Sequence, residues 1–182
     1  MPEKSTIAKL KKAGFFTHQD SIETNIAFQA DKAKEVMERF HELVEFRGIP
    51  STTSKRTLID TDEYIIVSKK ITPEVTVQVA SLIKAYGKDL QLSISFAHHD
   101  AKASGSQTTL ATVLIMVGAF FVWTGVGAIG LIIGIILAVG AKNKFRDEFE
   151  SQRNTFYSTV LEILGAACEE AGVDFEAKPN FS

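Results

Sequence analysis

The sequence predicts an α+β protein that is attached to a membrane. Apolar residues alternate with polar ones over several short stretches between positions 22 and 96, and a single helical pattern interrupts them. A stretch without any charged residue then runs from Ala103 to Gly140, long enough for a membrane segment. The expected fold is a small antiparallel sheet, β-α-β-β-β, with one covering helix, followed by a transmembrane helical hairpin and a long C-terminal amphipathic helix.

The chain is expected to divide into six parts. They are a basic amphipathic N-terminal segment 1–21, a cytoplasmic α+β domain 22–100, a linker 101–107, a transmembrane segment 108–141, an amphipathic helix 142–172 and a C-terminal tail 173–182. The first segment carries Ile7, Leu10, Phe15 and Phe16 among several lysines. This pattern suits a helix that lies on lipid and equally one that closes an end of the domain.

The first strand and helix are predicted from the period of their apolar residues. Ile22, Thr24, Ile26 and Phe28 alternate with polar positions, as in a half-buried strand. The residues that follow carry apolar side chains at the i, i+3, i+4 spacing of a helix over 31–47. Asp31 is the expected N-cap, and Gly48 with Pro50 the expected end.

Two antiparallel pairs of strands are expected after this helix. Residues 55–59 and 64–69 form the first pair, and 75–85 with 90–96 form the second. Tyr86-Gly87-Lys88-Asp89 can close the second pair as a two-residue hairpin. That turn sets Ala85 opposite Leu90, Ile83 opposite Leu92 and Val79 opposite Phe96. Both apolar rows then lie on one side of the sheet.

The charge-free stretch could hold one helix or two. Its core, residues 109–141, would form a helix of about 50 Å, against a hydrocarbon thickness of about 30 Å. Two helices of half that length would each be slightly short. Aromatic residues and the sequence Thr124-Gly125 fall at the midpoint, where a hairpin would turn at the far interface. A hairpin is therefore the favoured prediction, and one long tilted helix the alternative.

Two groups of residues near the membrane have predicted roles. Gly130, Gly134 and Ala138 place small side chains on one helix face, which suits self-association between chains or packing of the two hairpin arms. Lys142, Lys144 and Arg146 follow the apolar stretch directly. They are expected to contact lipid headgroups on the cytoplasmic side.

The predicted C-terminal helix has a continuous apolar stripe. It includes Phe145, Phe149, Phe156, Val160 and Ile163, and it widens from Phe156 onward. In the hairpin topology this helix emerges on the same side as the sheet, where it can pack on the sheet or pair with copies of itself. A single membrane span would leave the stripe without a partner in its own chain.

No residue pattern indicates catalysis or a cofactor. Neither a phosphate-binding loop nor a zinc-protease motif is present. His98, His99 and Asp100 fit the polar end of a strand better than a metal site, and Asp60, Asp62 and Glu63 fit a turn. Solvated His41 and the lone Cys168 give no catalytic signal. The formal net charge of −2 and the lack of a basic surface argue against nucleic-acid binding.

These observations favour a membrane-anchored, non-enzymatic interaction or scaffold module, with its soluble parts in the cytoplasm. Its expected partners are membrane lipid and either further copies of the chain or subunits of a larger membrane complex. Two alternatives remain open: a membrane-shaping or permeabilising protein that uses a wedge-like hairpin, and a tethered domain that binds a small ligand or lipid.

Overall fold

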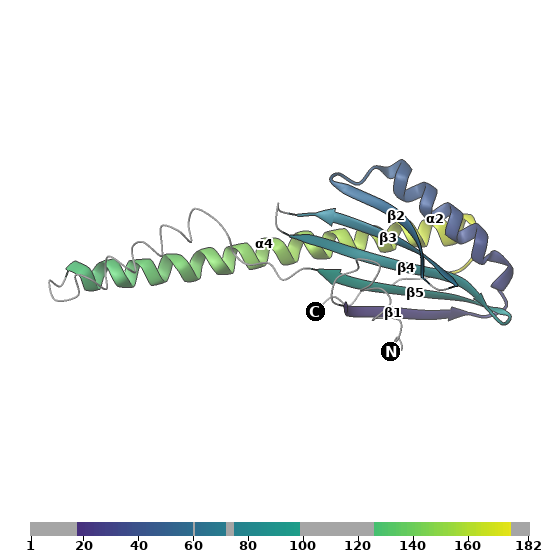
Figure 1. The fold of residues 1–182 in the computed structure, drawn as a ribbon, viewed down its shortest axis with the longest axis horizontal. Coiled ribbons are helices and arrows are strands. Elements are labelled where there is room, and N and C mark those ends of the chain that lie inside the picture. Colours follow the sequence, from purple (N-terminus) through teal and green to yellow (C-terminus); the bar gives the residue numbers. More distant parts are fainter. Residues whose placement is uncertain (1–17, 60, 72–74, 99–125, 176–182) are drawn as a thin grey trace. The chain divides into compact units, whose positions relative to one another are not determined.

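The computed structural model describes residues 18–59, 61–71, 75–98 and 126–175 (Figure 1). The chain divides into two compact units. The first consists of residues 1–100 together with 153–182, and is called the head below. The second consists of residues 101–152.

The head contains the predicted antiparallel sheet with a covering helix, in the order β-α-β-β-β-β, which has one strand more than the predicted β-α-β-β-β. Its five strands form one antiparallel sheet in the order β1-β5-β4-β3-β2 (Figure 1). The elements are β1 (His18–Ile26), the short 3-10 helix η1 (Ala30–Lys32), α2 (Ala33–Arg47), β2 (Thr52–Ile59), β3 (Asp62–Lys70), β4 (Thr76–Tyr86), β5 (Asp89–His98) and the long helix α4 (Val126–Glu170).

The predicted register of the central hairpin is confirmed. Ala85 pairs with Leu90, Ile83 with Leu92 and Val79 with Phe96. The turn between β4 and β5 has Gly87 first, at a φ of 62°. Glycine adopts this left-handed conformation without the steric cost that a Cβ atom brings. The turn chemistry and the apolar pattern therefore specify the same register.

Two predictions about the region between β1 and α2 are wrong. Asp31 is not the N-cap, because η1 precedes the helix and Lys32 occupies the cap position without a side-chain hydrogen bond. Phe28 does not continue the alternation of β1. It lies beyond the strand at a left-handed φ of 58° with 77% of its surface exposed. The predicted helix end is confirmed, since Gly48 has a left-handed φ of 53°.

α2 and the end of α4 lie on the same face of the sheet, called the core face. Arg56 of β2 is bound by Glu38 of α2, and the Phe96 ring of β5 packs on Tyr157 of α4. The register places Arg56 and Phe96 on one side, through the rows Arg56-Ile65-Ser81-Ile94 and Ser54-Val67-Val79-Phe96. The sheet is thus covered by α2 and by the end of α4, where the sequence predicted one helix.

The C-terminal helix is longer than predicted. It runs without interruption from Val126 to Glu170, whereas the amphipathic pattern placed its start at residue 142. The charges that begin at Lys142 change the surface of the helix but not its backbone hydrogen bonding, and no proline interrupts this range. Gly172, at a φ of 72°, follows its end as predicted.

The predicted membrane hairpin lies partly outside the described residues. Its first arm and turn, up to residue 125, are not described, while residues 126–141 form the beginning of α4. Within the described part of the chain, none of the helices is both long enough and apolar enough to cross a membrane.

Candidate interaction surfaces

The end of α4 is held on the sheet by a buried tyrosine. The Tyr157 hydroxyl donates a hydrogen bond of 3.1 Å to the Ala97 carbonyl oxygen of β5. Its ring centroid lies 4.8 Å from that of Phe96, at an interplanar angle of 50°. Burial raises the pKa of Tyr157 well above its ordinary value, so the hydroxyl remains a donor at any physiological pH. The helix is therefore positioned by a directional contact as well as by apolar packing.

Most of the predicted apolar stripe is buried in the chain's own structure. Phe156, Val160 and Ile163 are at most 1% exposed, and Phe149 is 7% exposed. The side chain of Phe145 lies outside the description. Packing on the sheet, one of the two roles considered for this helix, is thus established for its last part. An additional role of the stripe between chains stays a prediction.

The residues predicted to act at the membrane lie in the first half of α4. Gly130, Gly134 and Ala138 are helical, and Ala138 is half-buried. Lys144 and Arg146 are exposed, as headgroup contacts need to be. The Arg146 guanidinium also lies 3.7 Å from Asp147 and 3.9 Å from Glu150. The side chain of Lys142 is not described.

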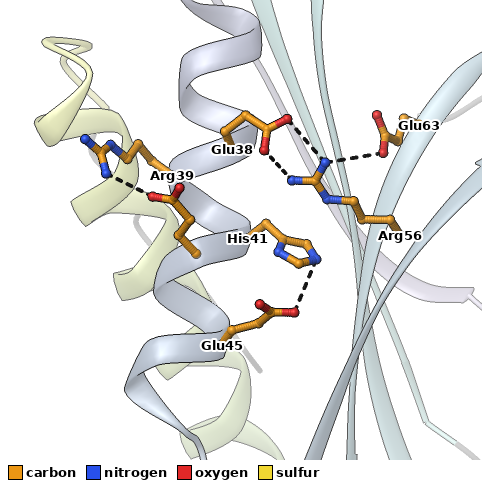
Figure 2. Close-up of polar contacts among 7 residues, drawn as sticks. Glu38, Arg39, His41, Glu45, Arg56 and Glu63 are labelled. Carbon is orange, nitrogen blue, oxygen red and sulfur yellow. Dashed lines mark hydrogen bonds and ion pairs between the residues drawn. The ribbon is translucent and has the colours of Figure 1, made fainter.

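A cluster of charged residues connects α2 to the edge of the sheet (Figure 2). Arg56 of β2 donates two hydrogen bonds to the Glu38 carboxylate of α2, of 2.6 and 3.2 Å. Glu63 of β3 lies 3.8 Å from the same guanidinium. On the same helix, His41 lies 3.6 Å from Glu45. Figure 2 shows these α2 side chains directed toward the strands.

The hydrogen-bonded pair of Arg56 and Glu38 is suited to positioning α2 on the sheet. The hydrogen bond from Arg56 lowers the pKa of the Glu38 carboxyl below its ordinary value of 4.5. A lowered folded-state pKa stabilises the fold above the unfolded-state value, and this contribution is lost as the pH falls through the folded-state pKa. The carboxylate is consequently ionised and paired at neutral pH, when a general acid would need its proton.

The described residues bring together no metal site, that is, no group of three or more His, Cys, Asp or Glu side chains. Asp62 is paired with Lys84 at 3.0 Å and Glu63 lies near Arg56. Asp60, His99 and Asp100 lie outside the description. Cys168 is fully buried, and burial raises its pKa to about 12, so its thiol is unreactive in the folded head.

Among the described residues of the head, four large apolar side chains are exposed that the sequence did not single out. Phe28 and Phe46 are 77% and 88% exposed, Leu58 and Tyr86 70% and 66%. Such side chains are common anchors of protein contacts. For Phe28 the signal in the sequence was misleading, because its position fits the alternation of β1. Phe46 could have been found, since it lies off the apolar stripe of its helix.

Phe28 combines exposure with backbone strain. Its left-handed conformation is one that bulky side chains rarely adopt. The turn is fixed to the β4–β5 hairpin, because the Phe28 amide donates to the Asp89 side chain and the Ala30 amide to the Lys88 carbonyl oxygen. Neither burial nor backbone preference accounts for a phenylalanine here, which makes it the best candidate for a contact residue on the head.

Comparison of the chain with protein-family models, with curated proteins and with solved structures finds no match.

Replacing Phe28 by asparagine should stabilise the head. Asparagine tolerates the left-handed conformation, and an exposed ring contributes little burial, so the free energy of unfolding should rise by about 1 kcal/mol. Denaturant unfolding followed by circular dichroism measures the change. The matched control is Phe46→Asn, which removes an equally exposed ring from a helical position and should bring no gain. A loss of stability in Phe28→Asn would show that the Phe28 ring has a structural role.

Proposed function

We propose that the protein is a membrane-anchored, non-enzymatic interaction module. The head lies at the cytoplasmic face of a membrane, and residues 108–141 hold it there as a helical hairpin. Membrane lipid is one partner, contacted by Lys142, Lys144 and Arg146. Further copies of the chain, or subunits of a larger membrane complex, are the other partners.

The observation that carries this proposal is the contact of Tyr157 with Ala97. The two residues flank the apolar stretch in sequence, yet they are joined in the head by a hydrogen bond. Both ends of the stretch therefore lie on the same side of any membrane that it enters. An even number of crossings, or a wedge in one leaflet, meets this condition, and a single crossing does not. This supports the hairpin over the single long helix.

The apolar part of α4 is shorter than the hydrocarbon core of a bilayer, as each arm of the proposed hairpin is expected to be. Residues 126–141 are helical, and 16 helical residues extend about 24 Å. Thinning of the bilayer or interfacial lysines can accommodate the remaining difference from about 30 Å.

Labelling of single cysteines in intact cells tests the topology. On a Cys168→Ser background, a cysteine replaces Lys88 in the β4–β5 turn or Lys178 in the tail. A membrane-impermeant maleimide should label neither position until the cells are lysed. A cysteine at Trp123, near the proposed turn, is the comparison position. It should be the most accessible of the three from outside if the hairpin crosses the bilayer.

Opposite labelling of positions 88 and 178 would contradict the proposal. It would place the two parts of the head on different sides of a membrane, which the Tyr157 contact forbids. Recovery of the unmodified full-length protein in the soluble fraction of its cells would contradict membrane attachment itself.

Self-association can be tested on the face of α4 that carries small side chains. Gly134→Leu adds a large side chain to the face that contains Gly130 and Ala138, and it should reduce the chemically crosslinked dimer at least about fivefold. Gly140→Leu is the matched control. It makes the same change off this face, where no atom lies within 4 Å of an added Cβ, and should leave the dimer unchanged. Equal dimer yields in wild type and Gly134→Leu would exclude this face as the contact.

A further inference from the structure

β2 is an edge strand, and among the described residues no strand lies on its outer side. The order β1-β5-β4-β3-β2 places β1 at the other edge. The pairing of β1 with β5 shifts in register between His18 and Asp20, whereas β2 pairs with β3 over Thr52–Ile59 without a shift. A register shift twists a strand and weakens it as a template for pairing, while a regular strand presents its backbone groups in one row. β2 is therefore the edge suited to pairing.

The backbone groups that face outward from β2 belong to alternate residues. The Lys70 amide donates a hydrogen bond of 3.2 Å to the Ser51 carbonyl oxygen, so these two residues form a hydrogen-bonded pair of the ladder. The Thr52 amide bonds instead to Ile49, outside the ladder. Because the two kinds of pair alternate in an antiparallel ladder, every second residue of β2 directs its amide and carbonyl away from β3. Beyond Thr52 these outward residues are Ser54, Arg56 and Leu58.

We infer that β2 of one chain pairs antiparallel with β2 of a second copy. A two-fold axis at Arg56 sets residues 53–59 of the two copies against each other and joins their outward residues by hydrogen bonds. A pair centred on Lys55 would place two lysines directly opposite, which is destabilising. The register centred on Arg56 opposes Leu58 to Ser54, Lys55 to Thr57, and Arg56 to itself.

The charges of β2 do not oppose this pair. The strand carries two of them, Lys55 and Arg56. The Arg56 guanidinium is bound by Glu38 of α2 and lies 3.8 Å from Glu63 of β3, so it is directed back over its own sheet and its charge is balanced. Lys55 stands opposite a neutral threonine in the chosen register.

The pair also covers an apolar side chain that a single chain leaves in water. Leu58 is 70% exposed, and the alternation of β2 places it on the same side of the sheet as Ser54 and Arg56. In the pair it lies opposite Ser54 of the second copy and diagonal to the aliphatic part of that copy's Arg56. A large side chain opposite a small one is a favourable cross-strand arrangement, because the two occupy complementary space.

The flank of α2 beside the β2 edge is complementary to itself. Arg39 on the other flank lies 3.9 Å from Glu170 of α4, whereas Glu38 and Glu45 are directed toward the strands (Figure 2). Lys34 precedes Glu38 by four residues, so it shares the β2 flank, and it is exposed. The two-fold axis makes the two α2 helices antiparallel, so Lys34 of each copy faces the Glu45 end of the other. This charge complementarity favours a second copy over an unrelated strand.

Disulfide trapping tests the pair and its register in the full-length protein. The background Cys168→Ser, Gly134→Leu removes the native thiol and the proposed contact through α4. On it, one variant carries Lys55→Cys and another carries Thr57→Cys. Positions 55 and 57 of different copies lie about 4.5 Å apart at Cα, within the range of about 4.4–6.8 Å for a disulfide, whereas two copies of position 55 lie about 7–8 Å apart.

Mild oxidation in detergent micelles should give the disulfide-linked dimer chiefly when the two variants are co-expressed. The expected yield is at least about fivefold above that of either variant alone. Absence of this dimer from the co-expressed variants, or a higher yield from Lys55→Cys alone, would overturn the inferred pair.

A proline substitution tests the backbone contact independently. The Leu58 amide is directed outward, so Leu58→Pro removes a hydrogen bond between copies and none within the sheet. It should reduce the trapped dimer at least about tenfold and leave the circular dichroism spectrum unchanged. Leu58→Ala is the matched control, because it removes the exposed side chain and keeps the amide, and it should retain more dimer. A dimer yield in Leu58→Pro equal to that of the parent would contradict strand pairing.

This contact in the head is separate from the membrane attachment proposed above. Neither readout depends on where residues 108–141 lie, so a failed disulfide would leave the proposed attachment untouched. The labelling of positions 88 and 178 tests the attachment without reference to β2.

Discussion

The head depends on the packing of the end of α4 against the core face of its sheet. Five strands at about 4.8 Å spacing form a surface about 19 Å wide, whereas packed helices lie 8–10 Å apart, so a single helix covers roughly half of it. α2 provides one half of the cover with Val36, Phe40 and Val44, and α4 provides the other with Phe156, Val160 and Ile163. The part of α4 that packs on the sheet follows the apolar stretch in the sequence, so the sheet cannot complete its core before residues beyond 153 are present.

This order of elements links the fold to the proposed function. Residues 101–152, which form the second unit, lie in the sequence between two parts of the head that contact each other. A segment of this kind is suited to anchoring a preformed head. Because Phe156, Val160 and Ile163 are buried, the proposed partner proteins would more readily contact exposed side chains such as Phe28, Phe46 and Tyr86.

The sequence was most informative where local chemistry and apolar pattern agreed. The β4–β5 register followed from Gly87 in the turn together with the alternation of both strands, and each alone would have been ambiguous.

Asp31 and Phe28 were misplaced because η1 and the turn before it are fixed by contacts with the distant residues Lys88 and Asp89. The apolar cluster on the opposite face of the sheet was missed for a related reason. Ala80 and Leu82 interrupt the polar positions of β4, but only the packing of the whole sheet brings them next to Tyr64 and Ile66. The charged cluster around Arg56 equally required knowledge of which helix residue meets which strand.

The most direct test of this account compares the unfolding of α4 with that of the sheet. Cys168 is fully buried on the core face, so its labelling by a rapid thiol reagent reports the release of α4. In full-length protein across a denaturant series, the account predicts that labelling of Cys168 and exchange of the β4 amides have the same midpoint, because neither part of the core persists without the other. Labelling of Cys168 at clearly lower denaturant, with the β4 amides still protected, would show that the sheet is stable without α4. That result would remove the argument that both ends of the apolar stretch belong to one head.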